Sequence, residues 1–124
     1  MIPWFEKHNR ISWMITIIGG FLIFYISSLE FGPSVAGIGL LSILYHILAF
    51  FCFAIFLFIS SLKGKKNYFV FVLAFVFAVF YGALDEVHQI FVPGRVSSFS
   101  DVFSDTVGIS LASLIYLIRI NWKG

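Results

Sequence analysis

The polar side chains best suited to chemistry lie between residues 85 and 105. They are Asp85, Glu86, Gln89, Arg95, Asp101 and Asp105. Carboxylates can transfer protons or bind divalent cations, and a guanidinium can bind phosphate. Four carboxylates opposite one guanidinium leave a formal surplus of three negative charges, which cannot all stay ionised at close range unaided. We therefore expect that some acids are protonated, that water separates them, or that a cation lies among them.

Two interpretations of this acidic segment stay open. In the first, Asp85, Glu86 and Asp101 bind a divalent cation such as Mg²⁺ or Ca²⁺, both of which prefer oxygen ligands. In the second, Arg95 and the loop amides tie the acids into a structural clamp, and Asp101 is stabilised near the N-terminus of a helix by the helix dipole.

The composition places these residues in a membrane protein. Of the 124 residues, 60% are hydrophobic and 11% are charged, whereas soluble domains carry about 25% charged residues. A helix that spans a bilayer needs about 20 mostly apolar residues. Apolar runs predict four such helices in a single domain, residues 1–124, at about 11–28, 39–62, 68–90 and 101–118. The predicted fold class is all-α, an integral membrane bundle of four transmembrane helices.

The distribution of charge predicts how this bundle is oriented. When the chain crosses the membrane four times, seven of the eight Lys and Arg residues fall on one side of the membrane and only Arg95 falls on the other. Because cytoplasmic loops are rich in Lys and Arg, both termini are expected in the cytoplasm. Every acid except Glu6 falls on the outer side. The net charge of +2 is too small to suggest nucleic-acid binding.

Helical periodicity predicts where the acids point. Small residues recur every four positions on the third and fourth predicted helices, as Ala74, Ala78 and Gly82 and as Ser104, Gly108 and Ala112. Such stripes allow two helices to approach closely in lipid, so we expect these two to pack as an antiparallel pair. The acids flank both stripes, so they are expected to converge at the outer end of the pair. His88 is expected to point away from them.

Other polar residues are predicted at the same outer level. Ser27 and Ser28 end the first helix on that side. His46 lies about two turns into the second helix, at about 1.5 Å per residue. A histidine in a membrane helix is often only a hydrogen-bonded packing residue. Because its depth matches that of the acids, a shared site is the favoured interpretation. Tyr45 and Tyr81 are equally consistent with ligands and with interfacial aromatic residues.

These residues together resemble the VanZ-like family of small bacterial membrane proteins. The matching positions are Ser27-Ser28, His46, Asp85-Glu86 with Gln89, Pro93-Gly94-Arg95, and Asp101 followed by Gly108. Asp105 departs from the pattern, which usually has Asn there. The resemblance implies a multi-pass protein of the bacterial cytoplasmic membrane, and it links the chain to resistance to teicoplanin, a lipid-bearing glycopeptide antibiotic. No settled reaction comes with the family.

The predicted site fits three functions. The first is an enzyme that acts on an outer-leaflet lipid or a lipid-linked envelope precursor. In this enzyme Arg95 holds a phosphate of the substrate. One carboxylate, or a metal bound to it, positions or activates a nucleophile, and His46 or Glu86 moves a proton. The catalytic candidates are Asp85, Glu86, His46 and Asp101, and the substrate-binding candidates are Arg95, Gln89, Ser28 and Asp105. The second function is non-catalytic binding or shielding of such lipids, and the third is transport by an oligomer. The sequence leaves enzymatic activity open.

Overall fold

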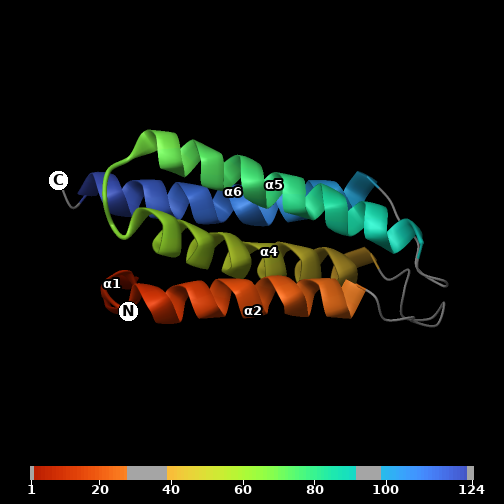
Figure 1. Cartoon of the computed structure of the whole chain (residues 1–124). Helices are drawn as coiled ribbons and strands as arrows, with labels where there is room; N and C mark the ends of the chain where they lie inside the picture. Colours follow the sequence, from red (N-terminus) through yellow and green to blue (C-terminus); the bar gives the residue numbers. More distant parts are fainter. Residues whose placement is uncertain (1, 28–38, 92–98, 123–124) are drawn as a thin grey trace.

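The computed structural model describes residues 2–27, 39–91 and 99–122 (Figure 1). Within the helices, nothing is described for the side chains of residues 27, 39–42, 89 and 99–101. The described residues form α1 (Ile2–Lys7), α2 (Asn9–Ser27), α4 (Gly39–Leu62), α5 (Tyr68–Ile90) and α6 (Phe99–Trp122). The predicted all-α fold class is confirmed, because four of these helices are long and apolar enough to cross a membrane.

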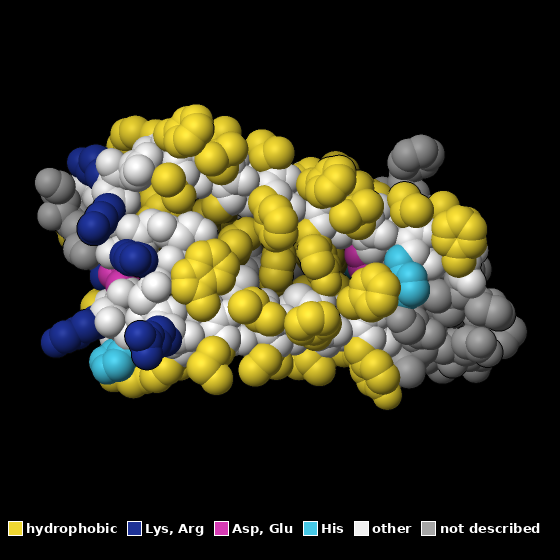
Figure 2. Space-filling model, viewed as in Figure 1, with side chains coloured by type: hydrophobic (Ala, Val, Ile, Leu, Met, Phe, Trp, Pro, Cys, Tyr) yellow, Lys and Arg dark blue, Asp and Glu magenta, His cyan; other side chains and the backbone are white. Residues whose placement is uncertain are grey.

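The face of the bundle in view in Figure 2 is apolar along most of its length. Large side chains such as Phe21, Phe69 and Phe103 are more than 70% exposed, which would be unfavourable in water but is favourable in a bilayer. The 24 residues of α6 give a length of about 36 Å, enough to cross a hydrocarbon core of about 30 Å. The chain is thus a multi-pass membrane protein.

Helix α4 lies at the centre of the packing. It contacts α6 most extensively and also packs against α2 and α5, whereas α2 and α5 contact each other little. Phe50, Ala54 and Phe58 of α4 are completely buried. In chain direction α4 and α6 run parallel to each other, and α2 and α5 run the opposite way (Figure 1). The core therefore surrounds α4, and the remaining helices are arranged around it.

The closest approach between helix backbones differs from the prediction. The sequence predicted that the stripe containing Gly108 would pack against α5. Instead, a Cβ atom added at Gly108 would lie 2.3 Å from the carbonyl oxygen of Ile47 and 3.1 Å from the backbone nitrogen of Phe51, both on α4. Gly108 thus packs against α4, whereas Gly82 of the stripe on α5 lies against Asp105 of α6, as the predicted pair requires. A stripe shows that a close partner exists but does not specify which helix provides it.

The two ends of the bundle carry different charges. Lys and Arg side chains gather at the end that contains α1, the α4–α5 turn and the last turns of α6 (Figure 2); we call this the basic end. The opposite end contains Asp85, Glu86 and Asp105, and we call it the acidic end. The first described helix, α1, and the last turns of α6 both lie at the basic end (Figure 1). That this end faces the cytoplasm stays a prediction.

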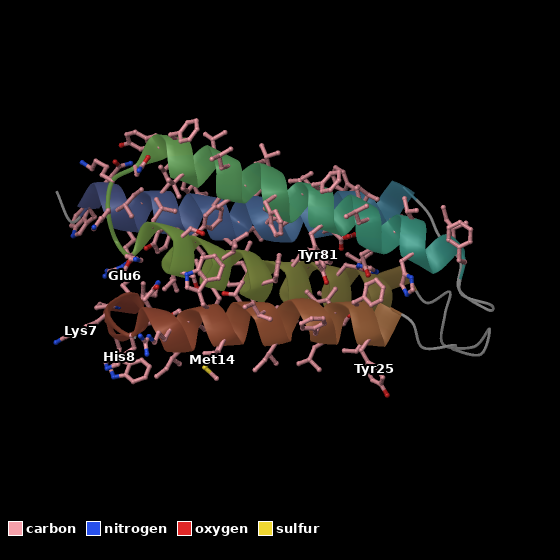
Figure 3. The ribbon with its side chains drawn as sticks, viewed as in Figure 1. Glu6, Lys7, His8, Met14, Tyr25 and Tyr81 are labelled. Carbon is pink, nitrogen blue, oxygen red and sulfur yellow. The ribbon has the colours of Figure 1, made fainter. Side chains whose placement is uncertain are left out.

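A short helix that the sequence did not predict closes the basic end. Glu6 of α1 points into the bundle, whereas Lys7 and His8 point away from it (Figure 3). The Glu6 carboxylate accepts hydrogen bonds from the Tyr116 hydroxyl at 2.5 Å and from Arg119 at 2.7 and 3.2 Å. The backbone N–H of Gly64 donates to the Tyr116 oxygen at 2.9 Å. We call these four residues the Glu6 clamp; it joins α1, the α4–α5 turn and α6.

Candidate functional site

A histidine–aspartate pair lies at the acidic end. A hydrogen bond of 2.7 Å joins Nδ1 of His46 on α4 to Oδ1 of Asp105 on α6. His46 is 1% exposed and Asp105 is 2% exposed. Both residues can meet because α4 and α6 run parallel and pack closely. In an environment of low dielectric, such a polar contact is stronger than it would be in water.

The shape of α5 makes room for this pair. A Cβ atom added at Gly82 would lie 3.2 Å from Oδ2 and 3.3 Å from Cβ of Asp105, and 3.5 Å from the Phe50 ring. A side chain at position 82 would therefore press on the Asp105 carboxyl. The missing side chain of Gly82 lets α5 lie directly against the buried pair.

Two further acids lie on α5 next to this contact. Asp85 is 3% exposed and Glu86 is 8% exposed. Asp85 comes one helical turn after Gly82, so both residues lie on one face of α5. The described acids of the predicted site are therefore buried and lie at the same end of the bundle as His46. This agrees with the shared depth expected from the sequence.

Tyr81 marks the boundary between the polar end and the apolar part of the bundle. Its side chain points from α5 toward α2 (Figure 3), and its hydroxyl donates a hydrogen bond to the carbonyl oxygen of Gly20. Asp85 follows Tyr81 by one helical turn, on the same face of α5. Tyr81 thus joins α2 to α5 just beside the acids.

The other aromatic and imidazole groups have packing contacts. The ring of Tyr45 packs edge-on against the ring of His46, with 5.2 Å between the ring centroids. The ring of His88 stacks on Phe24 of α2 at 4.1 Å. This stacking places His88 between α5 and α2 instead of beside Asp105.

Part of the predicted site lies beyond what the structure describes. Ser28 and Arg95 fall outside the described residues, and nothing is described for the side chains of Gln89 and Asp101. Among the described residues, no three His, Cys, Asp or Glu side chains are placed to hold a metal ion. Because the predicted metal ligands Asp85, Glu86 and Asp101 include an undescribed side chain, that site stays a prediction.

A comparison with protein families identifies the chain. Residues 4–120 match the family model described as VanZ/LLP1. The chain belongs to this family. No curated protein and no solved structure matches it. The resemblance inferred from the sequence is therefore confirmed over nearly the whole length, and it covers every residue of the candidate site.

In this VanZ/LLP1 protein, the His46–Asp105 pair has defined chemical properties. A carboxylate that accepts a hydrogen bond from Nδ1 fixes the tautomer of the imidazole and orients its ring. It also stabilises the imidazolium that forms when the ring takes up a proton. The pair is thus able to act as a proton acceptor and donor. Asp105 gains a role, as the partner of His46, that the sequence did not specify.

The pairing had only an indirect signal in the sequence. His46 is an isolated polar residue in an apolar helix, and buried polar groups in membranes are normally hydrogen-bonded. That rule requires a partner at matching depth, and several acids satisfied the requirement. Choosing Asp105 needs the contact between α4 and α6, which the periodicity of a single helix does not provide.

Proposed function

We propose that this protein acts chemically on the headgroup of an outer-leaflet lipid or a lipid-linked cell-envelope precursor. The observation that carries the proposal is the buried 2.7 Å contact between His46 and Asp105. Both residues lie near one end of membrane-spanning helices, just inside the candidate spans Ile43–Leu62 and Val102–Trp122, and we expect lipid headgroups close to that level. The proposal also follows the family's link to a lipid-bearing antibiotic, which implies an envelope function.

In this mechanism His46 is the general base and acid. The Asp105 carboxylate accepts a hydrogen bond from Nδ1–H and holds the ring, so the second ring nitrogen takes a proton from the attacking nucleophile and returns it to the leaving group. Asp85 or Glu86 positions the nucleophile. Arg95 binds the phosphate of the substrate, because a guanidinium offers paired donors to phosphate oxygens.

A direct test uses the purified full-length protein in lipid nanodiscs. The protein is incubated with bacterial membrane lipids, with and without Mg²⁺ or Ca²⁺, and altered lipids are sought by mass spectrometry. His46→Gln and Asp105→Asn should each lower product formation by about 10²–10⁴-fold, the usual contribution of general acid–base catalysis. His8→Gln, a histidine at the basic end, serves as the matched control. Undiminished product in both site variants would refute the mechanism.

Non-catalytic binding of the same lipids is the alternative function. The observation that favours it is burial: with 1% exposure, His46 is enclosed by protein, and a catalytic base needs contact with its substrate. In that case the wild-type protein would retain a specific lipid through purification and yield no altered product. The same mass spectra would reveal this, because they report bound and altered lipids together.

A further inference from the structure

An apolar groove runs along one side of the bundle between α2 and α5. These helices contact each other little, although each packs against α4. Figure 2 shows the resulting gap on the face in view, with hydrophobic side chains at its floor. Phe53 and Leu57 of α4 contribute to the lining. The gap is therefore a groove in the lipid-facing surface, open to the side.

The groove is continuous over much of the bilayer depth. It consists of two hollows of about 210 and 300 Å³ that share Trp13, Leu57 and Phe77 in their linings. On α5 its lining extends from Val70 to Tyr81, which corresponds to about 16 Å at the helical rise. That is close to half of a hydrocarbon core about 30 Å thick.

The groove leads to the candidate site. Its lining ends at Tyr81, and Asp85 follows Tyr81 by one helical turn along the same face of α5. Figure 2 shows an acidic side chain within the gap at this end, next to a histidine. The candidate site at the acidic end therefore lies next to the apolar groove, and Tyr81 lies between them.

We propose that this groove holds the hydrocarbon tail of the lipid whose headgroup occupies the candidate site at the acidic end. The lipid thus enters sideways from the bilayer, between α2 and α5. This inference rests on the proposed function and specifies its substrate class, a membrane-embedded lipid instead of a water-soluble precursor. Lateral entry also explains how a substrate reaches acids that are buried from the aqueous side.

The dimensions and chemistry of the groove favour a single tail over a partner helix. A helix with its side chains is about 10–12 Å wide and rises about 5.4 Å per turn, so one turn fills more than about 400 Å³. Each hollow is smaller than this, at about 210 and 300 Å³. The lining side chains are almost all apolar, which suits a tail without hydrogen-bonding groups. The polar boundary at Tyr81 then marks the level at which tail gives way to headgroup.

Photo-crosslinking tests this inference. The full-length protein is reconstituted in nanodiscs of phosphatidylglycerol that carries a diazirine in the middle of one tail, and the adducts are mapped by mass spectrometry. Adducts should be several-fold enriched on groove residues such as Ile17 and Phe77 relative to the lipid-facing residues Leu114 and Ile118 of α6. Equal labelling of the groove residues and of the α6 residues would overturn the proposal.

A matched pair of variants sharpens the test. Ile17 lines the groove and Ile18 does not, yet both belong to α2 and both are 54% exposed. Ile17→Trp should fill the groove and reduce adducts on Phe77 several-fold, whereas Ile18→Trp should leave them unchanged. Equal effects of the two variants would contradict the proposal. So would an enrichment of adducts in the separate hollow between α2 and α4, which includes Ile15 and Cys52.

The two proposals fail in different ways. If the groove is labelled specifically and no lipid is altered by the wild-type protein, the tail site stands and catalysis is refuted. If lipids are altered but Ile17→Trp affects neither product nor adducts, catalysis stands and the tail site is refuted. His46→Gln should lower product formation by about 10²–10⁴-fold while preserving the adducts, because it changes only the headgroup end.

Discussion

At the scale of single residues, the bundle contains buried carboxylates with identified partners at both ends. Glu6 is held by Tyr116 and Arg119 at the basic end, and Asp105 is held by His46 at the acidic end. Ionisable groups are costly inside a membrane protein unless they are paired. The Glu6 clamp has a clear structural purpose, since it connects α1 to α6. The His46–Asp105 pair joins α4 to α6, two helices that also pack closely at Gly108.

The coupling between His46 and Asp105 can be measured by a double-mutant cycle. His46→Leu or Asp105→Leu alone should lower the free energy of unfolding by about 3–5 kcal/mol, because each removes one member of a buried, hydrogen-bonded pair. The double variant should be less destabilised than the sum of the two. Unfolding in mixed detergent micelles provides the free energies. Simple additivity would show that the 2.7 Å contact does not couple the residues.

The Glu6 clamp gives a second prediction at this scale. Tyr116→Phe removes the hydroxyl that donates to Glu6 and accepts from Gly64, so it should destabilise the protein by about 1–3 kcal/mol. Thermal unfolding in detergent would show a lower midpoint. Tyr25→Phe is the matched control, since Tyr25 is 63% exposed and should have little effect. Equal midpoints for the two variants would mean that the clamp contributes no net stability.

At the scale of helices, hydrophobic length and periodicity predicted four spanning segments because each depends only on local sequence. The contacts between helices could not be predicted in the same way. Gly108 belongs to a small-residue stripe, but the stripe does not show that its neighbours are Ile47 and Phe51 of α4. Helix α1 was missed because its six residues are too few for an apolar period, and its position depends on the distant partners of Glu6.

The packing at Gly108 leads to a sharp prediction. Gly108→Ala would place a methyl group 2.3 Å from the Ile47 carbonyl oxygen, and a backbone atom cannot rotate away as a side chain can. The α4–α6 contact should therefore open, and the free energy of unfolding should fall by several kcal/mol. This loss is far larger than the gain of about 0.5–1 kcal/mol that Ala brings over Gly within a helix.

Gly19→Ala is the control for this substitution, since nothing lies within 4 Å of its added Cβ. It should be neutral or slightly stabilising in the same unfolding assay. If Gly108→Ala is as stable as Gly19→Ala, the close contact between α4 and α6 is wrong. That outcome would also remove the geometric basis of the His46–Asp105 pair, because both residues are held by these two helices.

At the scale of the whole molecule, the sequence could predict that the acids and His46 share one end, because helix direction alternates along the chain. It could not predict which side chains touch, since that depends on the rotation of each helix about its axis. The Lys and Arg side chains that the structure describes gather at one end, as the sequence indicated (Figure 2). The prediction that this end is cytoplasmic depends on the membrane, which no intramolecular contact determines.

The orientation can be tested by cysteine accessibility in intact bacteria, with the single cysteine first removed by Cys52→Ser. Phe91, 79% exposed, lies just after α5 at the acidic end, and Lys65 is exposed in the α4–α5 turn at the basic end. Because cytoplasmic loops are enriched in Lys and Arg, a membrane-impermeant maleimide should label Phe91→Cys in intact cells and Lys65→Cys only after permeabilisation. The reverse pattern would place His46 and Asp105 near the inner leaflet, and an outer-leaflet substrate would then be ruled out.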